Sequence, residues 1–246
     1  MDPTRLRDGL LVALTVSSGA VDAICWLALG KVFSAFMTGN LVFLGLRAGG
    51  APGQSVARVL AAVAGFAAGA AVAARIVAPA MNSGRAWTRR VTAALATALV
   101  PQAAFLALWA AVGGHPGGDT GHILIAMSAL AMGIQTTAGF SLGVRGLLST
   151  ASTATVAVLM GNGSAWKESK AERLRLAAAI LGLLGGAAIG AVLVINARPV
   201  APLFPLAVTS LVVAAATLAF AQPRAGRHAA PPASHPRIGT RIIRPR

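Results

Sequence analysis

The sequence predicts an all-α integral membrane protein with six transmembrane helices, and three observations support this fold class. Apolar residues make up 56% of the 246-residue chain, charged residues make up only 11%, and mean hydropathy is +0.74. A soluble domain carries about 25% charged residues to keep its surface hydrated. The chain also contains long charge-free runs, and its basic residues gather between them. A lipid bilayer is therefore the expected environment.

Eight charge-free apolar runs organise the chain, and a span of the hydrocarbon core needs about 20 residues. Six of the runs reach this length when their margins are included. They place spans at about 9–30, 57–79, 91–112, 120–141, 173–196 and 200–221. The run 32–46 is short for a span, and the run beginning at residue 146 is rich in hydroxyl groups. We expect segments 32–46 and 146–163 to be short interrupted or re-entrant helices.

The positions of the basic residues favour six spans over eight. If all eight runs crossed the membrane, the basic loop 75–90 would lie on the opposite face from both basic termini. With six spans, 17 of the 21 Lys and Arg residues share one face, and the other face keeps only Lys31, Arg47, Arg58 and Arg198. Cytoplasmic loops carry the excess of Lys and Arg. The sequence therefore predicts a multi-pass protein of a bacterial plasma membrane with both termini in the cytoplasm.

The two terminal segments lie outside the expected spans. Residues 1–8 form a cytoplasmic N-terminus, and residues 222–246 form a basic tail with five prolines and six arginines. Such a composition predicts disorder. Two roles are open for the tail, namely contact with anionic lipid headgroups and fixing the topology. Because the net charge of +15 is spread over the loops, nucleic acid is not an expected partner.

The chain contains an internal duplication. Residues 58–75 and 175–192 share eight identical positions, which include a leading arginine and two glycines. The first repeat covers about 9–112 and the second about 120–221. Because each repeat contributes three spans, an odd number, the second must enter the membrane in the opposite direction. The expected architecture is therefore two inverted three-helix repeats, a plan found in many secondary transporters.

Spaced glycines mark one helix in each repeat. They recur every four residues, which puts small residues on one face and allows close backbone approach between helices; they are Gly65 and Gly69 in the first repeat and Gly182, Gly186 and Gly190 in the second. Two interpretations remain open, namely ordinary tight packing and a surface that slides during gating. Both place these helices inside the bundle.

Several short motifs resemble a known family. They are Ser18-Gly19-Ala20-Val21-Asp22-Ala23, Leu29-Gly30-Lys31-Val32-Phe33, Met37-Thr38-Gly39-Asn40-Leu41-Val42 and Ala131-Met132-Gly133-Ile134-Gln135-Thr136. The chain resembles the YoaK family of bacterial multi-pass membrane proteins, a domain of unknown function, over roughly residues 8–220. The resemblance implies a multi-span membrane protein and no particular activity.

Asp22 is the acidic residue expected within an apolar span. A carboxylate at this depth costs several kcal/mol unless it is protonated, paired or hydrated, so it is a functional-site hypothesis by default. It could couple transport to a proton or cation, or pair with a cationic substrate. The alternative is a structural role, in which Asp22 caps a broken helix or satisfies backbone amides.

The two exceptional segments supply the other candidate binding residues. Thr38, Gly39 and Asn40 are expected to break the helix in segment 32–46, because Gly and Asn tolerate left-handed backbone. Thr150, Ser152 and Thr153 occupy the corresponding segment of the second repeat, and Gln135 is expected to be the counterpart of Asp22. Interrupted segments at matching positions of two repeats indicate a transporter site. Bonding of each hydroxyl to its own helix is the alternative.

These observations favour a small-molecule secondary transporter or permease. The competing class is a non-transporting membrane scaffold or accessory subunit. Motifs for hydrolases, metalloproteases and ATP-driven proteins do not occur in the sequence, so we expect no enzyme activity, no cofactor and no metal site. The substrate and the oligomeric state are not encoded in any recognisable motif.

Overall fold

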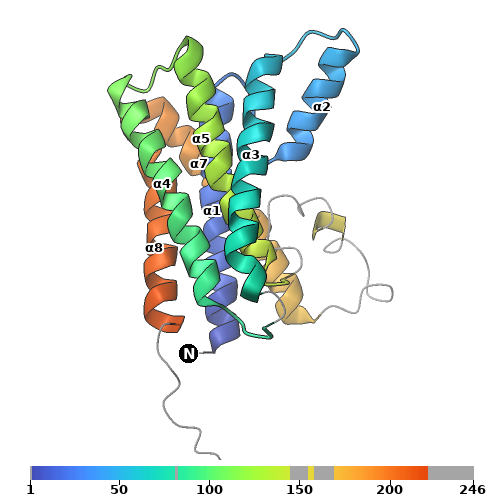
Figure 1. Ribbon diagram of the computed structural model, residues 1–246, viewed down its shortest axis with the longest axis vertical. Helices are drawn as coiled ribbons and strands as arrows, with labels where there is room; N and C mark the ends of the chain where they lie inside the picture. The colour runs from blue at the N-terminus through green and yellow to red at the C-terminus, as the bar shows by residue number, and fades with distance from the viewer. Residues whose placement is uncertain (1, 81–82, 145–154, 158–168, 221–246) are drawn as a thin grey trace, which may run out of the picture.

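A computed structural model describes residues 2–80, 83–144, 155–157 and 169–220, and all regular secondary structure in these ranges is helical (Figure 1). The helices are α1 (Pro3–Ala28), α2 (Met37–Ala48), α3 (Val56–Val77), α4 (Arg89–Ala111), α5 (Gly118–Phe140), α7 (Lys170–Asn196) and α8 (Leu203–Phe220). Two short 3-10 turns, η1 (Ala78–Ala80) and η3 (Arg198–Val200), extend α3 and precede α8.

Six of these helices are long and apolar enough to cross a membrane, and they are α1, α3, α4, α5, α7 and α8 with their short extensions. The expected all-α fold with six membrane-spanning helices is therefore confirmed at the level of helix length and composition. Helix α2 has 12 residues, which gives a length of about 18 Å at 1.5 Å per residue. It is too short to cross the hydrocarbon core, which is about 30 Å thick.

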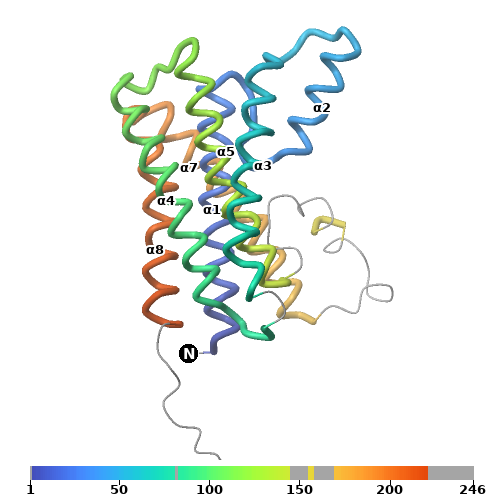
Figure 2. The backbone as a smooth tube through the Cα atoms, viewed as in Figure 1, coloured from blue at the N-terminus to red at the C-terminus, as the bar shows by residue number. Residues whose placement is uncertain are grey.

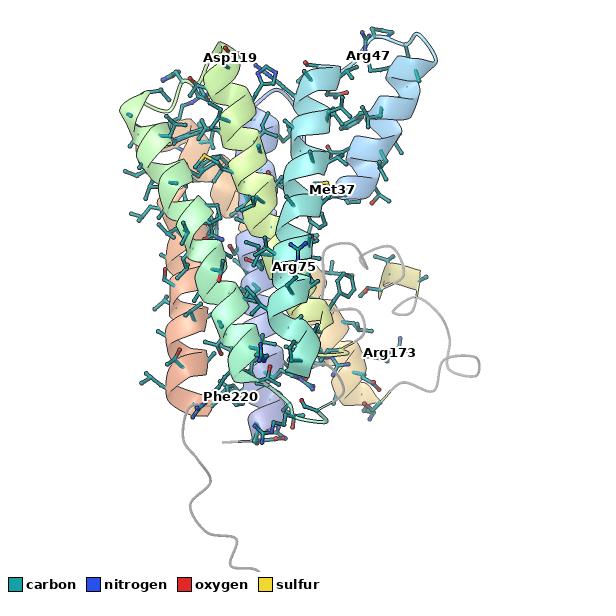
Figure 3. The ribbon with its side chains drawn as sticks, viewed as in Figure 1. Met37, Arg47, Arg75, Asp119, Arg173 and Phe220 are labelled. Carbon is teal, nitrogen blue, oxygen red and sulfur yellow. The ribbon has the colours of Figure 1, made fainter. Side chains whose placement is uncertain are left out.

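The helices run alternately along one bundle axis (Figure 2). Helices α1, α4 and α7 begin at the end of the bundle where the N-terminus lies, and α3, α5 and α8 run the other way (Figure 1). Phe220, the last residue of α8, lies at that same end (Figure 3). Both ends of the described helical bundle therefore share one side.

Side-chain caps mark the helix starts at this end. Asp2 accepts a hydrogen bond from the backbone N–H of Thr4 at 3.0 Å and begins α1. Thr88 caps α4, and Ser169 forms a capping box with Glu172 at the start of α7. Such caps satisfy N–H groups that have no partner within the helix. The sequence thus fixes where three spans begin.

The outer surface of the bundle is apolar, as contact with lipid requires. Ile195 of α7 and Leu218 of α8 are 74% and 77% exposed. The interior holds two apolar clusters, one around Trp109 and Ile125 and the other around Leu95. Lipid tails are as apolar as these side chains, so helix association in a bilayer depends on close packing rather than on hydrophobic burial.

Glycines bring the backbones of two helix pairs together. A Cβ atom added at Gly69 of α3 would overlap the carbonyl oxygen of Leu130 in α5, and one added at Gly186 of α7 would overlap that of Val16 in α1. A Cβ at Gly190 would lie only 2.6 Å from the oxygen of Ala20. The most extensive helix contacts are accordingly α3 with α5 and α1 with α7. The two glycine-rich helices pack on different partners.

The remaining two predicted glycines differ in how tightly they pack. A Cβ at Gly65 would overlap the carbonyl oxygen of Ala126, whereas a Cβ at Gly182 would meet its neighbours at 3.3 Å or more. Helices α4 and α8 complete the bundle by packing on α5 and α1 and on each other.

We predict that Gly69→Ala and Gly186→Ala each destabilise the protein, because the added methyl group meets backbone that cannot rotate away. Overpacking of this kind typically costs about 1–3 kcal/mol. Gly185→Ala is the matched control, since nothing lies within 4 Å of its Cβ position. Thermal unfolding in detergent should show lower midpoints for the first two variants and an equal or higher midpoint for the control. Equal midpoints for all three would contradict the described backbone contacts.

Candidate functional site

The chain between α1 and α3 turns back into the bundle. Gly30 and Lys31 adopt positive φ values of 92° and 59°, which reverses the chain directly after α1. Residues 32–36 then carry no regular helix, and α2 begins at Met37. Helix α2 rises from there to Arg47 at the same end of the bundle that α1 has just reached (Figure 3). The segment therefore enters the bundle and returns.

The Asp22 carboxylate holds the inner end of this segment. Its Oδ1 accepts hydrogen bonds from the backbone N–H groups of Ser34 at 2.7 Å and Ala35 at 2.8 Å, and its Oδ2 accepts one from Phe36 at 3.2 Å. Asp22 lies six residues before the end of α1, about 9 Å along the helix. The non-helical backbone thus reaches well below the top of α1, and the structural role expected as one alternative for Asp22 is present.

Asn40 and Cys25 brace the same backbone. The Asn40 side chain is fully buried; its Oδ1 accepts from the Phe33 N–H at 3.0 Å, and its Nδ2 donates to the Phe33 carbonyl oxygen at 2.7 Å. The Cys25 Sγ lies 2.9 Å from the Ser34 Oγ. Unpaired backbone groups cost several kcal/mol in lipid. These side chains therefore let non-helical backbone persist among the spans.

The predicted break at Thr38–Asn40 is wrong in position. These three residues lie in the first turn of α2, and the non-helical backbone comes before them, at 32–36. Gly39 is needed for packing instead, because a Cβ there would lie 2.7 Å from the Phe36 ring. Thr38 is exposed, and the Asn40 side chain donates a hydrogen bond to the backbone carbonyl oxygen of Phe33. The motif therefore supports the loop that precedes it.

Gln135 does not meet Asp22. Its Nε2 donates to the carbonyl oxygen of Leu14 at 3.0 Å, and Leu14 lies eight residues before Asp22, about 12 Å along α1. The Gln135 Oε1 is buried without a partner in the described part of the chain. Thr150, Ser152 and Thr153 lie outside the described residues. Of the predicted binding residues, the structure thus brings together Asp22, Gly39 and Asn40 around the loop.

A groove opens beside Asp22, with a volume of about 650 Å³. One wall comes from α1 and the loop, and the other from α7. Its lining includes Asp22, Trp26, Phe33, Phe36, Leu183 and Ala187. The Trp26 and Phe33 rings stack at 4.9 Å between centroids, and Phe36 meets Phe33 edge-on at 5.2 Å. The site is therefore an apolar, aromatic groove with one carboxylate.

Asp22 has no cationic partner among the residues that the structure describes. The ion pairs found there involve Asp2, Asp8 and Glu172. The same residues contain no group of His, Cys, Asp and Glu that could hold a metal ion. The groove thus combines a buried acid with aromatic surface and lacks a metal-binding arrangement.

Sequence reasoning missed a second polar cluster, between α1, α4 and α8. The Ser17 Oγ lies 3.3 Å from the Thr209 Oγ1, and the Gln102 Nε2 donates to that same oxygen at 3.3 Å. The Gln102 Oε1 is buried and unpartnered in the described part of the chain. Gln102 lines a cavity of about 20 Å³, which is room for one water molecule. A glutamine directly after Pro101 in an apolar run was the available signal.

We predict that Asp22→Ala releases the loop and exposes Cys25, the single native cysteine, to alkylation. Each backbone N–H left unpaired costs about 1–3 kcal/mol, so the rate of maleimide labelling in folded protein should rise about tenfold or more. Thr38→Ala is the matched control, because its side chain is exposed in α2. Unchanged labelling in Asp22→Ala would show that the loop does not depend on the carboxylate.

Comparisons with known proteins agree with the resemblance drawn from the motifs. A family model described as "Protein of unknown function (DUF1275)" matches residues 10–216. Over 160 aligned residues the chain is 39% identical to the UPF0700 transmembrane protein YoaK of Bacillus subtilis (strain 168). The alignment covers 65% of this chain and 68% of that protein. No solved structure matches. The chain therefore belongs to the DUF1275 family, the YoaK-like transmembrane proteins.

Proposed function

We propose that this protein is a secondary transporter or permease for a small molecule, built from two inverted repeats. The observation that carries the proposal is that four close glycine contacts correspond between the α1–α7 and α3–α5 interfaces. A single bundle that only packed tightly would have no need to use the same contact twice. Inverted repeats with discontinuous helices are the architecture in which alternating access is common.

The first correspondence involves a glycine in each repeat. A Cβ at Gly19 of α1 would overlap the carbonyl oxygen of Leu183 and approach the nitrogen of Ala187, and one at Gly133 of α5 would do the same to Phe66 and Ala70. Gly19 and Gly133 are 114 positions apart, and the two pairs of partners are each 117 positions apart.

The same two offsets describe the reciprocal contacts. Gly69 meets the Leu130 oxygen and Gly186 meets the Val16 oxygen. The two glycines are 117 positions apart, and their partners are 114 positions apart. In this register Asp22 corresponds to Thr136, one residue after its expected counterpart Gln135. Because α1 and α5 run in opposite directions (Figure 1), the correspondence supports an inverted repeat.

The charge distribution supports an orientation with both termini in the cytoplasm of a bacterial cell. The described basic residues fall into two groups by the loops and helix ends they occupy. Those toward the end that carries the N-terminus are Arg5, Arg7, Arg75, Arg85, Arg89, Arg90, Lys170, Arg173 and Arg175, and those toward the opposite end are Lys31, Arg47, Arg58 and Arg198. The positive-inside rule assigns the first group to the cytoplasm.

The α1–α7 interface differs at its two ends in a way that suits alternating access. At the proposed cytoplasmic end, the Arg175 Nη1 lies 3.4 Å from the Asp8 Oδ2 and joins the two helices. Toward the other end, the groove beside Asp22 runs along the same pair of helices, with Asp22 and Trp26 of α1 and Ala187 of α7 in its lining. We interpret this state as open to the outside. Sliding along the glycine contacts would close the groove and open the corresponding region between α3 and α5.

We predict that cysteines in the two corresponding regions respond in opposite directions. Ala187→Cys samples the outer groove, and its repeat counterpart is Ala70→Cys; both are made in a Cys25→Ser background. A membrane-impermeant maleimide should label the first from outside and the second from inside. A bulky label at Ala187→Cys should hold the outer groove open and slow labelling at Ala70→Cys, because both positions report one equilibrium. Val192→Cys, on the exposed face of α7, is the control.

The scaffold alternative makes a different forecast for the same variants. A protein that does not alternate should give rates at the two positions that are independent of each other and of which one is blocked. That outcome would remove the transporter proposal.

We predict which loops of the protein face the cytoplasm and which face outward. A reporter inserted in the loop at residues 83–86 should be active in the cytoplasm, and one inserted at 115–117 should be active outside. The physical reason is that the first loop lies beside Arg85, Arg89 and Arg90, whereas the second carries no Lys or Arg. Reversed signals would overturn both the orientation and the assignment of the groove to the outer side.

A further inference from the structure

The groove beside Asp22 has the chemistry of a site for an organic cation. We propose that it binds a monovalent cation with an apolar or aromatic body, and that this is the substrate class of the protein. The inference rests on the proposed transport function for its biological meaning. The contacts of Asp22, the aromatic wall and the size of the groove support the binding site itself.

Asp22 can carry its negative charge in this arrangement. An ionised carboxylate can only accept hydrogen bonds, and all three partners of Asp22 are backbone N–H donors. The carboxylate therefore needs no proton to satisfy its neighbours. An anion among membrane spans is nevertheless costly without a counter-charge, and the described residues supply none to Asp22. A cationic ligand would supply the missing charge.

The Asp22 carboxylate can accept one more hydrogen bond. Two carboxylate oxygens offer about four lone-pair positions. Oδ1 accepts two hydrogen bonds and Oδ2 accepts one, so one position on Oδ2 remains. Asp22 forms part of the groove lining. The carboxylate can thus face a ligand while it still holds the loop.

The aromatic wall of the groove also favours a cation. Trp26, Phe33 and Phe36 all line the groove and contact one another in stacked and edge-on geometry. Aromatic faces attract cations, with the strongest effect at Trp. A neutral ligand would leave the Asp22 charge uncompensated, and an anion would be repelled by it. The wall and the carboxylate therefore select for the same sign of charge.

The size of the groove suits an organic molecule. Small-molecule sites typically measure about 300–1,000 Å³, and this groove measures about 650 Å³. An inorganic cation would leave most of the groove empty and would meet only one carboxylate. The α7 side contributes Leu183, Leu184 and Ala187, which suit an apolar body. An organic cation matches both the volume and the lining.

The test uses two probe ions of nearly the same shape and opposite charge. Tetraphenylphosphonium and tetraphenylborate are titrated against the full chain in nanodiscs of zwitterionic lipid, with binding followed by equilibrium dialysis. We expect saturable binding of the phosphonium, at least a tenfold loss of affinity in Asp22→Asn, and no saturable binding of the borate. Phosphonium uptake no greater than that of nanodiscs without the protein would indicate partition into lipid and overturn the proposal.

A second pair of variants keeps the test decisive if Asp22→Asn does not fold. Ala191→Phe places bulk in the groove from α7 without changing Asp22, and Val192→Phe adds the same bulk on the neighbouring exposed position. The phosphonium should lose affinity in the first variant and keep it in the second. If Ala191→Phe binds as well as Val192→Phe, the probe occupies another site and the proposal fails.

This result is separable from the test of transport. Loss of cation binding together with alternating cysteine labelling would reject the substrate class and keep the transporter. Cation binding at Asp22 with fixed labelling would keep the site and reject transport. Saturable binding of tetraphenylborate alone would reverse the expected charge selectivity and reject the site.

Discussion

The architecture depends on the three backbone hydrogen bonds that the Asp22 carboxylate accepts from residues 34–36. Within a bilayer, backbone that leaves the helical conformation must find partners inside the protein. Asp22 supplies acceptors for the N–H groups just before α2, and Asn40 satisfies Phe33 from the other side. Without these contacts the segment between α1 and α3 would be expelled from the bundle, and the wall of the groove would be lost with it.

The glycine contacts determine where this segment can lie. Gly19 sits one turn before Asp22 on α1 and lets α7 approach at backbone distance. Gly190 of α7 continues this close contact against Ala20, and the groove runs beside it between α1, the loop and α7. Gly19, Leu183 and Ala187 belong both to this close contact and to the groove lining. The polar loop and the tight interface are thus parts of a single arrangement.

Much of the fold could be predicted because hydropathy and charge are local properties of the sequence. The six spans follow from run length, and the return of segment 32–46 follows from its shortness and from the basic loops. The position of the break could not be read, because Gly39 signals backbone freedom but serves to admit the Phe36 ring. In the register proposed for the repeats, Asp22 corresponds to Thr136 rather than to Gln135, because Gly19 and Gly133 then make corresponding contacts.

Helix pairing was also beyond the sequence. The glycines of α3 and α7 predict close helix contacts, yet a helix face of small residues can pack on any helix with a similar face. Selection of α5 for α3 and of α1 for α7 depends on the three-dimensional crossing. The second polar cluster was missed for a related reason, since Ser17, Gln102 and Thr209 lie on three helices and meet only in the folded bundle.

The structural and functional interpretations of Asp22 were posed from the sequence as alternatives, and the geometry makes them compatible. An asparagine could accept from Ser34 and Ala35 at its one oxygen, but its amide nitrogen would face the Phe36 N–H, so a carboxylate suits all three bonds. An aspartate instead keeps a negative charge beside an aromatic groove, at a depth where charge is costly. Loop support accounts for the hydrogen bonds. The charge that comes with this cap has no partner among the described residues, and the groove is where a cationic ligand could offset it.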